Sequence, residues 1–412
     1  MGKTGFDGGK VSGYYLGWCR GLNLNSGADF KMKYEPLEKV RKELKVKWLR
    51  PKIDQQKLRQ LSQRSDLQGW IQAGGHLGIW LITGVFVFYF WMQHNWIAFL
   101  VTLFCHGAVA SFFIPAAHEL GHGTVFKTKS LNKIFLYVYS CLAWWDMFDY
   151  AASHTYHHRY TLHPHADREN LLPLSPMVGR FFLVQLFTIN LLTQPGRVFG
   201  KGGLLSTIYL TSLNTQGHVG SVETPIHEWQ QALHADQPEL HKSSIWWARF
   251  LLLFHIAVVF ASLLSGYWIF TLIISLSPFI ANWFSYAIGM TQHCGLKEND
   301  ADFRKCVRSV KTNQLFEFLY WRMNWHTEHH MFAGVPCYNL KLLHHEIKVQ
   351  MPEPRTLSGA WQEMRDIWFR QQADPDYFFD TPVPLIAYDS VGISRDDAVE
   401  SSIGDLAPKG LL

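Results

Sequence analysis

The chain has 412 residues, 48% of them hydrophobic, and a formal net charge of +5 at pH 7. Much of the basic excess lies in residues 39–64 without an interleaved aromatic reading motif, so we expect a cytosolic, membrane-facing surface and no nucleic-acid partner. The six cysteines form no CxxC pair, which argues against a disulfide framework.

Long apolar runs with almost no charge alternate with polar stretches, a distribution typical of a membrane protein. Residues 1–70 are polar and form the expected cytosolic N-terminal region, with an amphipathic helix predicted over 35–47. Two spans are predicted next, over 71–91 and 96–115. The link between them is short enough for a tight helical hairpin.

A second hairpin is predicted over 246–264 and 267–290, with Gly266 at its turn and Pro278 as a kink in the last span. Two hairpins place both termini and every long polar segment on one side of the bilayer. That side carries nearly all the Lys and Arg, so the positive-inside rule predicts that it is cytosolic. The predicted fold class is therefore an all-α membrane protein with four transmembrane helices and a helical cytosolic cap.

The segments between and after the hairpins are assigned to the cap or to its edge. Residues 131–147 and 180–192 are apolar and rich in aromatics, and helical spacing does not decide between interfacial helices and cap core. Residues 340–349 and 357–371 are predicted to be amphipathic helices that cover the cap, followed by a loose tail. The expected divisions of the chain are an N-terminal region, a membrane and catalytic-cap domain, and a C-terminal helix with its tail, at 1–70, 71–345 and 346–412.

Histidines gather in three clusters that lie outside the predicted spans. They are His118-Glu-Leu-Gly-His122, His154-Thr-Tyr-His157-His158 and His326-Thr-Glu-His329-His330. Residues three and four apart share one face of a helix, so each cluster is expected to aim its imidazoles at one point. Neutral imidazole is a good ligand for iron, zinc, copper or nickel, which makes these eight histidines candidate metal ligands.

His293 is a candidate ninth ligand because it is expected to lie at the same depth relative to the membrane as His118. It lies three residues after the fourth predicted span, as His118 lies three residues after the second. Eight or nine nitrogens are too many for one ion, since zinc takes four ligands and octahedral ions take six, so two metal ions are expected. Iron is favoured over zinc, because open positions at non-haem iron can activate oxygen.

Other side chains near the clusters are candidates for supporting roles. Polar groups that could orient a ligand imidazole through its second ring nitrogen are Glu119, Glu328, Asp167 and Asn324, with Asp146, Asp149 and Asn170 as further candidates. Aromatic side chains that could line a substrate channel are Trp144, Trp145, Phe148 and Tyr150.

Four further histidines are not included in the expected ligand set. Pro164 disrupts the helix around His163 and His165. His106 and His255 fall inside predicted spans, where packing roles are expected.

The three clusters, together with Asn324-Trp-His-Thr-Glu-His-His-Met-Phe-Ala-Gly-Val-Pro336, resemble the membrane fatty-acid desaturase and hydroxylase superfamily. The order of clusters and hairpins is similar too, over residues 70–345. The resemblance implies a four-span, mushroom-shaped fold with a di-iron centre in a cytosolic cap. It also implies that the eight clustered histidines bind iron, with a further ligand near the end of the fourth span, where His293 lies.

The same resemblance implies an O2-dependent oxidoreductase that desaturates or hydroxylates an unactivated C–H position of a fatty-acyl or lipid-like substrate. The sequence has no His-Pro-Gly-Gly haem segment, so electrons are expected from a separate donor of cytochrome b5 or ferredoxin type. The third cluster begins with His326 rather than the Gln of front-end desaturases, and residues 159–165 depart from the usual continuation of the second cluster. These departures leave the substrate open.

Two alternatives remain at this point. One is a hydroxylase or monooxygenase that acts on a non-lipid small molecule. The other is a membrane zinc metalloprotease, because His118-Glu119-x-x-His122 also matches HExxH, although this would leave the other two clusters unused. The expected location is an integral membrane position with a cytosolic active site, in the endoplasmic reticulum of a eukaryote or the inner membrane of a bacterium.

Overall fold

The computed structural model describes residues 37–167, 176, 178–192, 203–218 and 232–384. Within these ranges the chain is mostly helical, and its one sheet is a parallel pair of two-residue strands, β1 (Val310–Lys311) and β2 (Arg355–Thr356). The predicted helical class is therefore confirmed in its coarse form. The start of the predicted helix over 35–47 and the end of the predicted tail lie outside the described residues.

Among the described residues, three helices are long and apolar enough to cross a membrane, and each contains one of the predicted spans. They are Asp66–Met92, Trp96–Gly121 and Pro238–Leu264. The first joins α3 (Asp66–Gly69), η1 (Trp70–Gly74) and α4 (Gly75–Met92), and the second joins α5 (Trp96–Ala110) and α6 (Phe113–Gly121). The third is α12 (Pro238–Leu264).

Residues 267–290, predicted as a fourth span with a kink at Pro278, do not form one helix but several short ones. After Gly266, which turns the chain with a φ of +76°, the polypeptide forms η2 (Thr271–Ser275), η3 (Ser277–Phe279) and α13 (Trp283–Gly289). Pro278 lacks an N–H and so cannot donate a helical hydrogen bond. The backbone that follows it bonds to residues 188–190 instead. The amide of Asn190 donates to Phe279 O at 2.7 Å, and the amide of Ala281 donates to Thr188 O at 2.8 Å.

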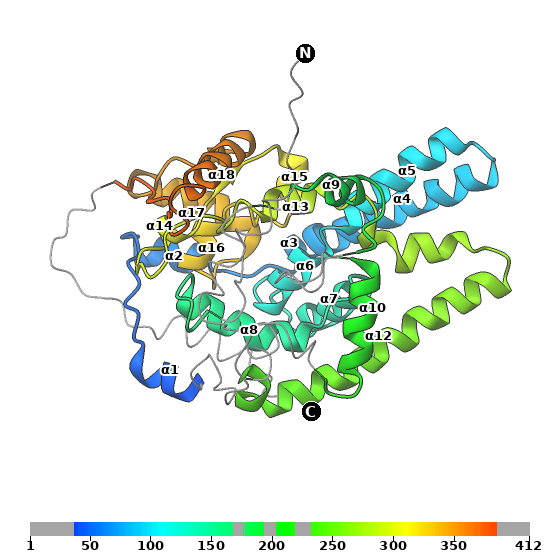
Figure 1. Ribbon diagram of the computed structural model, residues 1–412, viewed down its shortest axis with the longest axis horizontal. Helices are drawn as coiled ribbons and strands as arrows, with labels where there is room; N and C mark the ends of the chain where they lie inside the picture. The colour runs from blue at the N-terminus through cyan, green and yellow to red at the C-terminus, as the bar shows by residue number, and fades with distance from the viewer. Residues whose placement is uncertain (1–36, 168–175, 177, 193–202, 219–231, 385–412) are drawn as a thin grey trace, which may run out of the picture.

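The two hairpins project from the same side of a helical body (Figure 1). They contact each other through an apolar cluster, in which the rings of Phe88 and Phe270 stack 5.3 Å apart. Their outer faces expose large apolar side chains, among them Val85, Ile97 and Leu264. An apolar surface of this extent is typical of contact with lipid.

The body contains the remaining helices. In chain order they are α1 (Leu37–Glu43), α2 (Gln55–Leu61), α7 (Lys129–Leu142), α8 (Met147–Tyr160), α9 (Arg180–Phe187), α10 (Leu204–Asn214), α14 (Phe303–Cys306), α15 (Gln314–Leu319), α16 (His326–Met331), η4 (Cys337–Asn339), α17 (Leu340–Ile347), η5 (Lys348–Gln350) and α18 (Leu357–Gln371). The bounds of α18 match the prediction. Within the apolar segment 131–147, α7 ends at Leu142, and α8 begins after Asp146, which accepts bonds from the amides of Phe148 and Asp149.

Buried side chains join the body to the first hairpin. Trp321 is fully buried, and its indole N–H donates to His76 Nδ1 at 2.9 Å. The hydroxyl of Tyr139 donates to Ala73 O at 2.9 Å. The largest apolar core cluster extends along α6 to residues on both sides of α16, so the helices that carry the first and third histidine clusters share one core.

Candidate metal centre

Eight of the nine candidate histidines lie on or at the end of three helices, and all nine are buried. The first cluster is at the C-terminal end of α6, the second is on α8, and the third forms most of α16. His293 is the exception, because it lies in a turn after α13. Histidines from segments far apart in sequence therefore meet in one place inside the body.

The nine histidines form two groups, within each of which the potential ligand atoms lie within 4.8 Å of one another. The first group is His118, His122, His154, His158 and His329, and the second is His157, His293, His326 and His330. The expectation that each cluster aims at one point is confirmed for His118 and His122 but is wrong for the two HxxHH clusters, each of which is divided between the groups. Histidines four apart stay together, but those three apart separate, because positions i+3 and i+4 differ by about 100° around the helix axis.

The spacing of the ring nitrogens fits two shared ions. His122 Nε2 lies 3.0 Å from His118 Nε2 and 3.1 Å from His154 Nε2. His326 Nε2 lies 2.9 Å from His293 Nε2 and 3.1 Å from His330 Nε2. A ring nitrogen carries either one proton or one lone pair, so it cannot form two such hydrogen bonds. Nitrogens bound to one ion at about 2.1 Å and at right angles lie about 3.0 Å apart, which matches these distances.

Burial lowers the pKa of several of these imidazoles, which keeps them neutral and thus able to bind metal. Removal from water, with a smaller effect of His157, lowers the pKa of His293 to about 3. The pKa of His122 lies well below its usual value, chiefly through burial and next through neighbouring imidazoles. The same causes lower the pKa values of His158, His326, His329 and His330. Both groups therefore offer unprotonated nitrogens at neutral pH.

Second ring nitrogens have partners that set the direction of several imidazoles. His157 Nδ1 hydrogen-bonds the carboxylate of Asp167 at 3.0 Å, whereas His329 Nδ1 lies 3.2 Å from the carboxylate of Glu119 without a hydrogen bond. Both carboxylates were candidates from sequence.

Two further partners were not predicted from sequence. His330 Nδ1 lies 3.1 Å from Thr161 Oγ1, and His293 Nδ1 lies 3.0 Å from Cys306 O. Thr161 is three residues beyond the second cluster, a position that could have suggested this role. The carbonyl of Cys306 leaves no signal in the sequence.

The other polar candidates lie elsewhere. Glu328 bonds His344 Nδ1 and Ser309 Oγ, both at 2.6 Å, and Asn324 Nδ2 donates to Val310 O. Glu328, on α16, and Asn324, just before it, therefore bond the segments before and after α16. The sequence had predicted instead that they orient a clustered imidazole.

Of the remaining polar candidates and the histidines left out of the ligand set, those that the structure describes are found away from the two histidine groups or in other contacts. Asp146 caps α8 and Asp149 pairs with His234, while Asn170 lies outside the described residues. His106 and His255 bond backbone carbonyls within the membrane region, as expected for packing roles. His163 bonds Thr161 O, and His165 is exposed.

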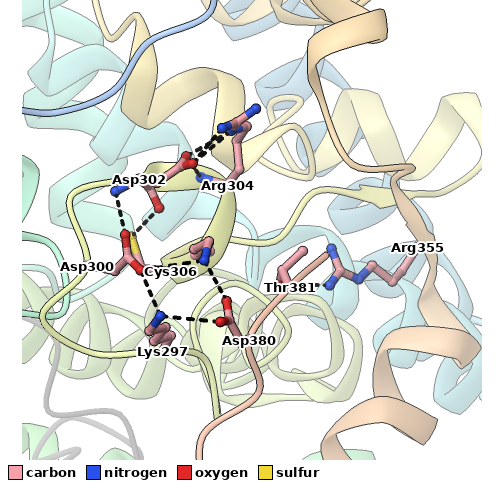
Figure 2. A network of polar contacts seen from close by, with 9 residues as sticks. Lys297, Asp300, Asp302, Arg304, Cys306, Arg355, Asp380 and Thr381 are labelled. Atoms are coloured by element: carbon pink, nitrogen blue, oxygen red, sulfur yellow. Dashed lines mark hydrogen bonds and ion pairs between the residues drawn. The ribbon is translucent and has the colours of Figure 1, made fainter. Parts of the chain in front are cut away.

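A polar network fixes the loop that ends at Cys306 (Figure 2). Arg304 pairs with Asp302 at 2.6 Å, and Lys297 bonds Asp300 at 3.1 Å and Asp380 at 3.3 Å. Lys305 also pairs with Asp380, at 3.0 Å. These contacts hold the carbonyl that faces His293 Nδ1.

A largely apolar cavity opens beside the first group of histidines. Its lining includes His118, His122, His154 and His158, with Ala117, Gly121, Lys133, Leu136, Tyr137, Met147, Phe148, Tyr150, Ala151, Thr155 and Leu240. Two of the four aromatic channel candidates thus lie in its wall. Trp144 instead stacks on His255 at 3.8 Å, and Trp145 packs against the ring of Tyr150 at 5.1 Å.

Comparison with known families gives one match, to the family described as fatty acid desaturase, over residues 94–358. The matched region is more than half of the chain and includes all three histidine clusters and His293. Comparison with curated proteins gives no match.

Proposed function

Because the chain belongs to the fatty acid desaturase family, we propose that it is an O2-dependent membrane oxidoreductase with a di-iron centre. It desaturates or hydroxylates an unactivated C–H position of a fatty-acyl or lipid-like substrate. The observation that carries the proposal is the pair of buried histidine groups, one of which borders an apolar cavity.

The nine histidines are the proposed iron ligands, five for one ion and four for the other. Nitrogen donors suit iron, and their count leaves coordination positions open. Two iron ions held there would supply the activation of oxygen and the oxidising power for an unactivated C–H bond. Asp167 and Thr161 hold the rings of His157 and His330 in place through Nδ1, so that Nε2 faces the ion.

The cavity residues are proposed to position the substrate and to exclude water. Phe148 and Tyr150 present aromatic surface beside the first group, which fits an apolar chain better than a charged one. Desaturation removes two hydrogen atoms and, with two electrons and two protons from outside, reduces one oxygen molecule to two water molecules. The electrons are proposed to come from a separate donor protein of cytochrome b5 or ferredoxin type.

The zinc protease alternative fits the site poorly. His118 and His122 share their group with three histidines from the other clusters, which a single protease zinc would not need. Glu119 would have to act as the general base, but its carboxylate lies 3.2 Å from His329 Nδ1 and it is absent from the described cavity lining.

The metal centre is proposed to lie on the cytosolic side of the membrane. The three long helices and the exposed apolar faces of both hairpins support a membrane location. We propose that residues 267–290 cross the bilayer a fourth time despite their break, since they return alongside α12 toward the body (Figure 1). The membrane would be the endoplasmic reticulum in a eukaryote or the inner membrane in a bacterium.

The proposed function is tested by metal analysis of the purified protein together with oxygen uptake in the presence of a reductant. We expect about two irons per chain, since nine nitrogen ligands exceed what one ion can bind. Mass spectrometry of lipids and small metabolites from cells with and without the protein identifies the product. One zinc per chain with peptide cleavage would contradict the proposal, and an oxidised non-lipid metabolite would change its substrate.

Replacing Asp167 with Asn is expected to weaken iron binding without abolishing it. The neutral amide still reaches His157 Nδ1 but no longer offers a charged acceptor to the ring. Loss of such a partner typically lowers metal affinity about 10- to 100-fold, which a competition titration with a chelator measures. The matched control is Asp366→Asn, on the exposed side of α18, for which the affinity should not change.

Replacing Ala151 with Trp is expected to block substrate while leaving the iron in place. Ala151 lies in the cavity wall, and an indole there would occupy the space beside Phe148 and Tyr150. The prediction is a fall in turnover with unchanged iron content, measured by product formation and metal analysis of the same sample. Ser153→Trp, on α8 but absent from the cavity lining, is the control, and equal losses in both variants would argue against a substrate cavity.

A further inference from the structure

His293 differs from the other eight candidate ligands in lacking a helix to hold it. It lies in the turn that follows α13, so its position depends on contacts made by the turn itself. Its ring is fixed through Nδ1 by Cys306 O at 3.0 Å. What holds the backbone of the turn must therefore be found among the surrounding side chains.

Arg308 binds the carbonyl groups on both sides of His293. Its Nη1 donates to Thr291 O at 3.0 Å and to Cys294 O at 2.7 Å. Its backbone amide donates to Gln292 O at 2.8 Å. One residue thus bonds the carbonyls of the two residues before His293 and of the residue after it, and this fixes the turn from one side.

Arg308 depends in turn on a carboxylate from the C-terminal helix. Its side chain is fully buried, and its Nε donates to Glu363 Oε1 at 2.6 Å. A buried guanidinium without a counter-charge is strongly destabilising, so Glu363 is needed to keep Arg308 in this place. The second oxygen of Glu363 accepts a bond from Arg355 at 3.2 Å. Arg355 also donates to the hydroxyl of Thr381 (Figure 2).

The helix that carries Glu363 packs directly on the same turn. The indole N–H of Trp361 donates to Ala287 O at 2.8 Å, and Met364 belongs to one apolar cluster with Met290 and Cys294. The family match ends at residue 358, before these α18 residues. Part of the support of His293 therefore comes from a region of the chain that the family match does not cover.

We propose that Glu363, acting through Arg308, is a positioning residue that holds His293 in the second histidine group. The inference rests on the proposed function, since it assigns to His293 a metal that only the proposal places there. Of the two irons, the one in the second group depends on this chain of contacts. The first group has no member on the turn and is independent of it.

The test is Glu363→Gln in the full-length, iron-loaded protein. We expect a chelator to remove one of the two irons about 10- to 100-fold more readily than from the unaltered protein, with the other unchanged. The Mössbauer spectrum should change for one iron site only. Asp366→Asn is the matched control, since it removes a carboxylate one turn along α18 whose side chain is 57% exposed, and both irons should stay as they were.

A double variant covers the case in which Glu363→Gln fails to fold. Arg308→Met with Glu363→Leu replaces the buried ion pair with apolar side chains, an exchange that is often neutral for stability. It removes the side-chain donors to Thr291 O and Cys294 O, so the same selective loss of one iron is expected. Two unaltered irons in a folded variant would overturn the inference alone, whereas a lack of iron in the unaltered protein would overturn the proposed function as well.

Discussion

Replacing His326 with alanine is expected to remove iron from the second group and to lower oxygen-dependent product formation more than about 100-fold. This loss exceeds the roughly 10- to 100-fold effect of removing a group that bonds the second ring nitrogen of a ligand histidine. The physical reason is its central place, since its Nε2 lies 2.9 Å from that of His293 and 3.1 Å from that of His330. Metal analysis and product assay of the purified variant measure both effects. The first group should keep its iron, because it shares no ligand with the second.

His345→Ala is the matched control for this prediction. His345 follows His344 on α17 and is exposed, and it belongs to neither histidine group. Its replacement should leave two irons and full turnover. Full activity in the His326 variant would contradict the assignment of His326 as a ligand, and an equal loss in both variants would show that the effect is not specific to the group.

Local features of the sequence predicted much of what lies near the site. The long apolar runs predicted three spans that the structure contains, and amphipathic spacing predicted α18 with its correct bounds. The same local logic found all nine histidines that the structure gathers. These predictions succeed because hydrophobicity over a bilayer thickness and residue spacing on a helix act within one segment.

Features that depend on contacts between distant segments were not predictable in this way. Pro278 predicted a kink within 267–290, but the backbone bonds of Phe279 and Ala281 to Asn190 and Thr188 leave no pattern in that segment. Helix geometry separates positions i+3 and i+4 by about 100°, but whether the histidines of an HxxHH cluster then join one group or two depends on where the other helices place their own histidines. Likewise, the position of Glu328 within its cluster predicts that it orients a ligand imidazole, but its carboxylate bonds His344 and Ser309.

Removing the metal is expected to lower the stability of the whole body as well as its activity. Without an ion, nine buried imidazoles face one another at distances that hydrogen bonds cannot all satisfy. An ion that binds only the folded state stabilises it by about 4 kcal/mol when its free concentration is 1,000 times Kd. The chelated protein should therefore melt several degrees lower, which the fluorescence of its tryptophans reports.

Adding back different metals separates the structural effect from the chemical one. Zinc also binds imidazole nitrogen but undergoes no redox change, so it should restore much of the melting temperature and none of the oxygen uptake. Iron should restore both. A double variant, His118→Ala with His326→Ala, removes one ligand from each group, and its melting temperature should no longer respond to chelator. A melting temperature of the unaltered protein that ignores chelator would show that the histidine groups hold no tightly bound ion, because an ion bound to the folded state alone must raise its stability.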